Sequence, residues 1–149
     1  MTTDLGSGVG EVNPAEAWEI LKSDPKSVLI DVRTTAEWGF VGVPDLSGLG
    51  KSLVCVEWAQ YPNMSKNPLF AEQLMNELGD EVPDCVLFIC RSGARSMHAA
   101  RAVAAELSAA GRSVRCLNVA EGFEGDLDEQ NHRGAVNGWK TRGLPWRQS

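Results

Sequence analysis

The chain has 149 residues, of which 43% are hydrophobic, and a formal net charge of -6. A chain of this length suits one globular domain, which can bury enough apolar surface to fold without disulfides or a structural metal. The acidic balance argues against nucleic acid or an anionic membrane as a partner, because both favour a basic surface. An acidic protein that handles an anionic ligand must therefore concentrate its positive charge locally.

The N-terminal segment lacks the features of a targeting sequence. It has no basic start and no apolar stretch, and no apolar run in the chain reaches the roughly 18 residues that a membrane-spanning helix needs. We therefore expect a cytoplasmic protein whose four cysteines are free thiols. Residues 1–11 are polar and rich in glycine, which predicts a flexible tail, and the folded domain is expected to span residues 12–146.

Helix and strand patterns alternate in the first half of the chain. Asn13 followed by Pro14 is typical of a helix start, and Gly79 after an apolar helical repeat is typical of a helix end. Short apolar runs bounded by polar residues predict buried strands. The elements predicted here are helices at residues 14–23 and 69–79 and strands at residues 27–32 and 52–58.

The second half continues the alternation. We predict strands at residues 85–90 and 113–119, a helix at residues 97–111, and an irregular C-terminal segment with one short helix at residues 137–141. Strands alternating with helices indicate an α/β protein, with a central parallel sheet flanked by helices on both faces. The sequence shows no internal repeat and no second domain.

The stretch LFICRSGARS, residues 87–96, carries the candidate site. An apolar strand ends on Cys90, and ligands of open parallel sheets bind beyond the carboxyl ends of the strands. Small residues after the cysteine let backbone N–H groups approach an anion, and a helix N-terminus favours an anion by ~0.3–1 kcal/mol. Arg91 and Arg95 add positive charge. The pattern therefore predicts that Cys90 is a thiolate nucleophile.

The other cysteines lack this setting. A cysteine at a strand end is often only a small buried hydrophobic residue, and the sequence by itself leaves that interpretation open for Cys90. For Cys55, Cys85 and Cys116 it is the favoured interpretation, because each lies in an apolar run with no cationic cluster after it.

Two further kinds of site are disfavoured. The chain has no C-x-x-C motif, and His98 and His132 lack ligand spacing, so we expect neither a metal site nor a cofactor. The segment DLSGLGKS, residues 45–52, is similar to a nucleotide-binding loop, but its first glycine is replaced by Asp45 and it does not follow a strand. We interpret it as a surface loop.

Three segments in this order resemble the rhodanese-like sulfurtransferase family. They are DVRTTAEW (residues 31–38), CRSGARS (residues 90–96) and LNVAEGFEG (residues 117–125), and GWKTRGLPW (residues 138–146) resembles the end of such domains. The combination is specific to the family, whereas no single segment would be. The resemblance implies one rhodanese-like domain covering residues 12–146.

The resemblance also implies a reaction. Cys90 would take a sulfane sulfur from thiosulfate or a similar small anionic donor, and a thiol or cyanide acceptor, which could be a protein thiol, would remove it from the Cys90 persulfide. Asp31 and Arg33 would be a supporting acid–base pair. Apart from the resemblance, we expect the protein to be a monomer. The implied substrate-binding residues are Arg91, Ser92, Gly93, Ala94, Arg95 and Ser96.

Departures from the family keep other interpretations open. The segment GFVGVPDLSG (residues 39–48) lacks the histidine of the usual family sequence Gly-His-Ile-Pro-Gly-Ala. The loop from Gly42 to Ser65 is longer than usual, and the sequence does not indicate its function. One alternative is a sulfur-carrier or binding module that acts on a protein partner. Another is a rhodanese-related phosphatase or arsenate reductase, which needs Cys-x5-Arg. Ser96 occupies that position here, and the arginine comes one residue early, at Arg95.

Overall fold

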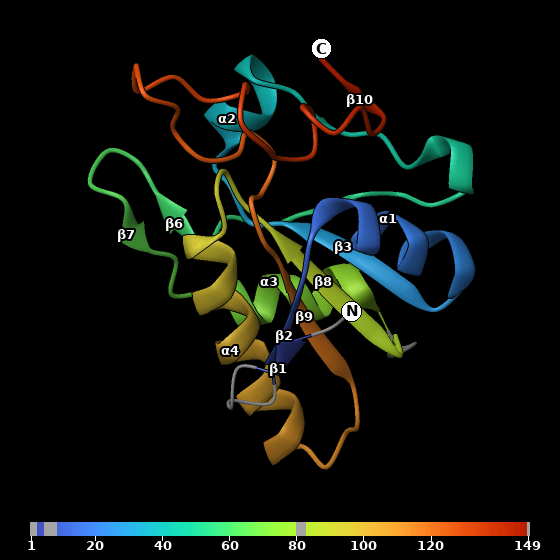
Figure 1. The fold of residues 1–149 in the computed structure, drawn as a ribbon. Coiled ribbons are helices and arrows are strands. Elements are labelled where there is room, and N and C mark those ends of the chain that lie inside the picture. Colours follow the sequence, from blue (N-terminus) through green and yellow to red (C-terminus); the bar gives the residue numbers. More distant parts are fainter. Residues whose placement is uncertain (1–2, 5–8, 80–82, 149) are drawn as a thin grey trace.

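The computed structural model describes residues 3–4, 9–79 and 83–148 and has a six-stranded sheet at its centre (Figure 1). The strand order is β1-β2-β9-β8-β3-β5, in which β1 is antiparallel to β2 and every other pair is parallel. The predicted α/β class with a central parallel sheet is confirmed. The strands are β1 (Thr3–Asp4), β2 (Val9–Val12), β3 (Ser27–Asp31), β5 (Val54–Cys55), β8 (Cys85–Ile89) and β9 (Arg115–Val119).

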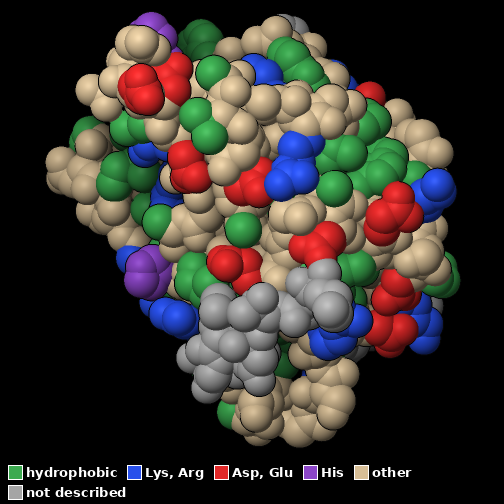
Figure 2. Space-filling view, viewed as in Figure 1, with side chains coloured by type: hydrophobic (Ala, Val, Ile, Leu, Met, Phe, Trp, Pro, Cys, Tyr) green, Lys and Arg blue, Asp and Glu red, His purple; other side chains and the backbone are tan. Residues whose placement is uncertain are grey.

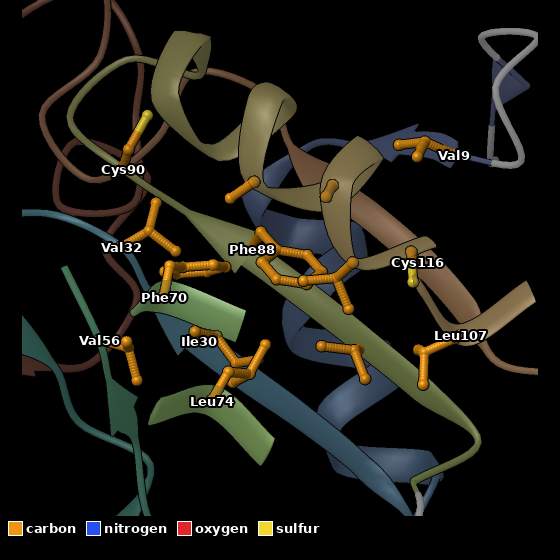
Figure 3. Packing of buried hydrophobic residues seen from close by; sticks show 14 residues of the cluster. Val9, Ile30, Val32, Val56, Phe70, Leu74, Phe88, Cys90, Leu107 and Cys116 are labelled. Atoms are coloured by element: carbon orange, nitrogen blue, oxygen red, sulfur yellow. The ribbon is translucent and has the colours of Figure 1, made fainter. Parts of the chain in front are cut away.

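Helices cover both faces of the sheet. On one face α3 (Phe70–Leu78) and α4 (Ala94–Ala109) bury Leu74 and Leu107 in one cluster with Phe88 of β8. On the other face α1 (Pro14–Ser23) packs against Leu87, the preceding residue of the same strand. Figure 3 shows the first cluster, with Cys90 at one end of it near Val32. The sheet core therefore extends up to the candidate nucleophile.

Local capping explains where two helices begin. Asn13 and Glu16 form a capping box at the start of α1, as the Asn13–Pro14 pair predicted. Thr34 and Glu37 form a second capping box at the start of α2 (Thr35–Phe40), a helix absent from the sequence prediction. The Thr-x-x-Glu pattern was its only signal, because α2 is too short to show an apolar repeat.

The prediction of a flexible tail over residues 1–11 is wrong for the described residues of that segment. Thr3 and Asp4 form β1, which pairs antiparallel with β2. Val9 to Glu11 belong to β2, which pairs in parallel with β9, and Val9 is fully buried. The four residues VGEV are too short a pattern to indicate a strand. They form β2 because they pair with the edge of β9. Residues 1–2 and 5–8 of the predicted tail lie outside the described residues.

Three other predicted elements differ from the structure. The strand expected at residues 52–58 is reduced to β5, where Cys55 is exposed, and the helix expected at residues 137–141 is replaced by turns. Helix α4 begins at Ala94, three residues earlier than expected. The remaining elements are β4 (Val43–Pro44), the 3-10 helix η1 (Ser47–Leu49), β6 (Ala59–Gln60), β7 (Ser65–Lys66) and β10 (Trp146–Arg147).

The segment similar to a nucleotide-binding loop has a structural function. Lys51 Nζ donates hydrogen bonds to the carbonyl oxygens of Asp24 and Ser27, at 3.0 and 2.7 Å. The ammonium group of Lys51 is therefore held by the residues that lead into β3. This contact supports the interpretation of the segment as a surface loop.

On the face drawn in Figure 2, acidic and basic side chains are interspersed, as on an ordinary solvated surface. Within residues 3–4, 9–79 and 83–148, no helix combines the length and the apolar character needed to cross a bilayer.

Candidate active site

Cys90 directly follows β8 at the carboxyl end of the sheet and is 1% exposed. Its Sγ accepts a hydrogen bond from the Gly93 N–H at 3.1 Å and lies 3.2 Å from Ser96 Oγ. Gly93, with a φ of +113°, turns the chain into α4, whose 16 residues begin at Ala94. The sulfur therefore lies at a helix N-terminus, where backbone amides stabilise negative charge.

The short loop after Cys90 is held from outside by residues 122–125. The N–H of Phe123 donates to the Cys90 carbonyl at 2.8 Å, and those of Glu124 and Gly125 donate to the Arg91 carbonyl at 3.0 and 3.2 Å. These bonds hold the Cys90 and Arg91 carbonyl oxygens against residues 122–125 and so fix the start of the loop. Residues 122–125 belong to the segment LNVAEGFEG, whose part in the site the sequence did not reveal.

The six predicted substrate-binding residues form the loop and the first turn of α4. Arg91 and Ala94 are exposed, and Ser92 and Gly93 are partly exposed. Arg95 is partly buried, and Ser96 is fully buried against Cys90. Of the six residues, Gly93 and Ser96 contact the Cys90 sulfur, whereas Arg91 is exposed and Arg95 is paired with Glu37.

Arg95, which the sequence suggests as a positive charge for an anionic donor, is paired within the protein. Its guanidinium group makes a bidentate ion pair with Glu37 of α2, at 2.7 and 2.9 Å, and the two side chains are 19% and 12% exposed. Burial alone would raise the pKa of Glu37, but the hydrogen bonds and charge of Arg95, helped by Thr34, lower it from 4.5 to about 2. The pair ties the first turn of α4 to α2 and compensates the charge of Arg95.

Replacing Glu37 by glutamine is expected to lower the free energy of unfolding at neutral pH by roughly 1–3 kcal/mol, because Arg95 loses its charged partner while the capping box survives. The folded-state pKa of Glu37 lies below its ordinary value, so the contribution is complete above pH 4.5 and disappears as the pH falls toward 2. Urea unfolding of both proteins across this range checks it. A difference that stays constant with pH would contradict the assignment.

Asp31 and Arg33 form a fully buried ion pair behind the loop. Arg33 Nη2 lies 2.6 Å from Asp31 Oδ2 and donates to the Gly42 carbonyl at 2.7 Å. The guanidinium carbon also lies 4.4 Å from the ring centroid of Phe123, the residue that binds the Cys90 carbonyl. The pair therefore joins the end of β3 to the segment that holds the loop.

A series of hydrogen-bonded polar side chains behind the sulfur was not predicted from the sequence. Ser96 Oγ donates to Asn118 Oδ1 at 2.5 Å, and Asn118 Nδ2 donates to the Glu11 carboxylate at 3.0 Å and to the Gly93 carbonyl at 3.2 Å. Asn118 is 1% exposed. A polar residue inside the apolar strand at residues 115–119 was the available signal, whereas Glu11 was assigned to the tail.

The remaining cysteines contrast with Cys90. All four are free, and Cys85 and Cys116 are buried in the clusters on opposite faces of the sheet. Burial raises the pKa of each of these two thiols to about 11, so both stay protonated at neutral pH. In the part of the chain that the structure describes, no three His, Cys, Asp or Glu side chains are grouped to hold a metal ion.

The strand β8 of the parallel sheet leads into a cysteine loop at a helix N-terminus, which places Cys90 at the edge where open α/β sheets bind their ligands. Comparison with known proteins specifies the class: the model of the rhodanese-like domain matches residues 13–129, and the chain belongs to this family. The resemblance stated from the sequence is therefore confirmed.

Close relatives share nearly the whole chain. The crystal structure of Rv0390 from M. tuberculosis is similar with a TM-score of 0.78 and 46% identity, and the match covers 93% of this chain and 97% of that one. The uncharacterized protein RP600 homolog of Rickettsia rickettsii is 31% identical over 138 residues, and the uncharacterized protein RC0915 of Rickettsia conorii is 30% identical over 138 residues. Each of these two matches covers 93% of this chain and 97% of the relative.

Proposed function

We propose that the protein is a sulfurtransferase that moves a sulfane sulfur from thiosulfate, or a similar anionic donor, to a thiol or cyanide acceptor. The observation that carries the proposal is the position of Cys90 Sγ, which accepts the Gly93 N–H at the N-terminus of α4. Membership of the rhodanese-like family supports the same reaction class.

The reaction requires only the sulfur of Cys90 and the two substrates. The thiolate attacks the outer sulfur of thiosulfate, and the S–S bond of the donor breaks as sulfite leaves with the bonding electron pair. A persulfide remains on Cys90, with its negative charge next to the Gly93 N–H and the helix N-terminus. Cyanide or a thiolate then attacks the terminal sulfur, and the Cys90 thiolate leaves. No electrons are gained or lost overall.

The same geometry disfavours phosphate or arsenate chemistry. A phosphatase loop of this kind needs an arginine at the position of Ser96 to clamp a tetrahedral oxyanion, and Ser96 is buried against Asn118. Arg95 cannot replace that arginine without leaving Glu37. The six-residue span from Cys90 to Arg95 therefore suits one sulfur atom better than a phosphate group.

The test is intact-mass measurement before and after thiosulfate treatment. We expect one added sulfur atom in the native protein and none in Cys90→Ala, because the other thiols lack the loop. A variant with Cys55, Cys85 and Cys116 replaced by serine or alanine is the control, and it should still take up sulfur. Loss of uptake in this folded variant, or uptake by Cys90→Ala, would overturn the assignment.

Two further measurements separate the alternatives. Sulfur loading without turnover to cyanide or thiols would indicate a carrier module that acts on a protein partner. Hydrolysis of an aryl phosphate, abolished by Cys90→Ser and competed by vanadate, would instead indicate a phosphatase. We further propose that the protein acts as a monomer in the reducing cytoplasm, without nucleic acid or membrane partners, on the basis of its free thiols and acidic charge.

A further inference from the structure

Arg95 holds the carboxylate of Glu37 beside the cysteine loop. It precedes Ser96, whose Oγ lies 3.2 Å from Cys90 Sγ, and its two terminal nitrogens donate to the Glu37 carboxylate at 2.7 and 2.9 Å. In Figure 1, the helix α2, which carries Glu37, lies beside the loop that joins β8 to α4. An anion that reaches the Cys90 sulfur therefore meets a negative side chain as well as a positive one.

The carboxylate of Glu37 is ionised and fixed in place. With a pKa of about 2, it carries its charge at neutral pH, and its Oε1 also accepts from the Thr34 N–H at 3.1 Å and from the Thr34 hydroxyl group at 3.0 Å. The hydrogen bonds of Glu37 raise the pKa of Arg95, and Cys90 contributes to the same shift. The ion pair is therefore within electrostatic reach of the sulfur.

We propose that Glu37 is a specificity-determining residue, which offsets the charge of Arg95 and makes the site favour singly charged sulfur donors over doubly charged ones. The inference rests on the proposed function and names its donor class. Thiosulfonates, R–SO₂–S⁻, and organic persulfides, R–S–S⁻, carry one negative charge, whereas thiosulfate carries two. Arg95 and Glu37 together add no net charge, so the exposed Arg91 is the cation of the loop that remains for a donor.

The transfer step is the same for both classes of donor. The Cys90 thiolate attacks the outer sulfur, the S–S bond of the donor breaks, and the rest of the donor leaves with the bonding electron pair. Thiosulfate releases sulfite, a thiosulfonate releases a sulfinate, and an organic persulfide releases a thiolate, and each leaves a persulfide on Cys90. The two classes therefore differ in the charge that the site must accommodate.

Charge is the property on which Glu37 acts. The electrostatic energy of a bound anion is proportional to its charge, so a dianion is repelled by Glu37 twice as strongly as a monoanion at the same place. Both side chains of the ion pair are partly buried, so water and salt screen them less than they screen free surface charges. Arg95 could bind a dianion directly only by leaving Glu37, which would strand that carboxylate without its counter-charge.

The experiment compares thiosulfate with methanethiosulfonate, CH₃SO₂S⁻, in single-turnover loading of Cys90 followed by intact mass. Glu37→Gln keeps an oxygen for Thr34, but its amide nitrogen faces Arg95 and cannot accept from it. We expect the thiosulfate-to-methanethiosulfonate ratio of loading rate constants to rise roughly three- to tenfold, the range for one unit charge a side chain away. The change should shrink at high salt.

Arg95→Gln gives the opposite sign. It leaves Glu37 without its counter-charge, so the ratio should fall. The double variant Glu37→Gln/Arg95→Gln removes both charges and should return the ratio to about the native value, because the pair adds no net charge. If Arg95 instead bound the second charge of thiosulfate directly, the double variant would keep the low ratio of Arg95→Gln. These two variants still decide the sign if Glu37→Gln does not fold.

Glu16→Gln is the matched control. Glu16 has the same position in the capping box of α1 that Glu37 has in the capping box of α2. However, α1 packs on the opposite face of the sheet from α4. The control therefore removes the same charge and keeps the same kind of cap away from the cysteine loop. It should leave the ratio unchanged.

An unchanged or lower ratio in folded Glu37→Gln would overturn the proposal, because a merely structural ion pair alters the loading of both donors alike. A double variant with the low ratio of Arg95→Gln, or an equal rise in Glu16→Gln, would also overturn it. Binding of sulfate and of methanesulfonate to Cys90→Ser, followed by NMR, makes the same comparison between dianion and monoanion without transfer. Failure of both donors to load would contradict the proposed function, and the binding ratio would still decide the inference.

Discussion

Arg33→Met is expected to lower the free energy of unfolding by roughly 3–5 kcal/mol, because it leaves the Asp31 carboxylate buried without a counter-charge. Both side chains are fully buried, so water cannot solvate the remaining charge. A loss of this size is a large part of the roughly 5–15 kcal/mol that stabilises a typical domain. Urea unfolding at neutral pH measures it, and a loss below about 1 kcal/mol would contradict the assignment of a buried ion pair.

A double variant separates charge from packing. Replacing Asp31 by leucine together with Arg33→Met removes both charges, and we expect it to regain much of the lost stability. It does not restore the contacts of Arg33 with the Gly42 carbonyl and the Phe123 ring. Slow sulfur loading in a stable double variant would show that these contacts support the cysteine loop. Native loading would limit the pair to a structural function.

The cysteine loop could be predicted because its parts are consecutive in the sequence. Cys90 to Ser96 follow one apolar strand and precede one helix, so local patterns place them at the end of β8 without knowledge of the rest of the fold. The same applies to α1 and α3, whose starts and ends carry capping and glycine patterns. These elements were predicted within a few residues.

The contacts that complete the site depend on strand order, which the local pattern does not contain. Glu37 and Arg95 are separated by 58 positions, and Asn118 and Glu11 by 107. The second contact requires β2 to lie beside β9, and β2 has only four residues, one of them a glycine. Local patterns therefore could not show that Arg95 is paired with Glu37, or that Glu11 belongs to a strand.

Gly122→Ala is expected to displace the cysteine loop. Gly122 has a φ of +67°, and a Cβ at this position would lie 2.5 Å from the Cys90 carbonyl oxygen and 2.6 Å from the Arg91 carbonyl group. Backbone atoms cannot move aside as a flexible side chain can, so either the loop or residues 122–125 must shift. A shift of about 1 Å at a reacting group can cost roughly 10²-fold in rate. We expect a loss of that order in sulfur loading from thiosulfate.

Gly50→Ala is the matched control, because Gly50 has a nearly identical φ of +69° but no atom within 4 Å of the added Cβ. Both variants suffer the strain of a left-handed alanine, roughly 1–2 kcal/mol, whereas only Gly122→Ala collides with the loop. Urea unfolding and loading kinetics on both proteins separate the two effects. If Gly122→Ala lost no more stability than Gly50→Ala and loaded sulfur at the native rate, residues 122–125 would not be what positions Cys90.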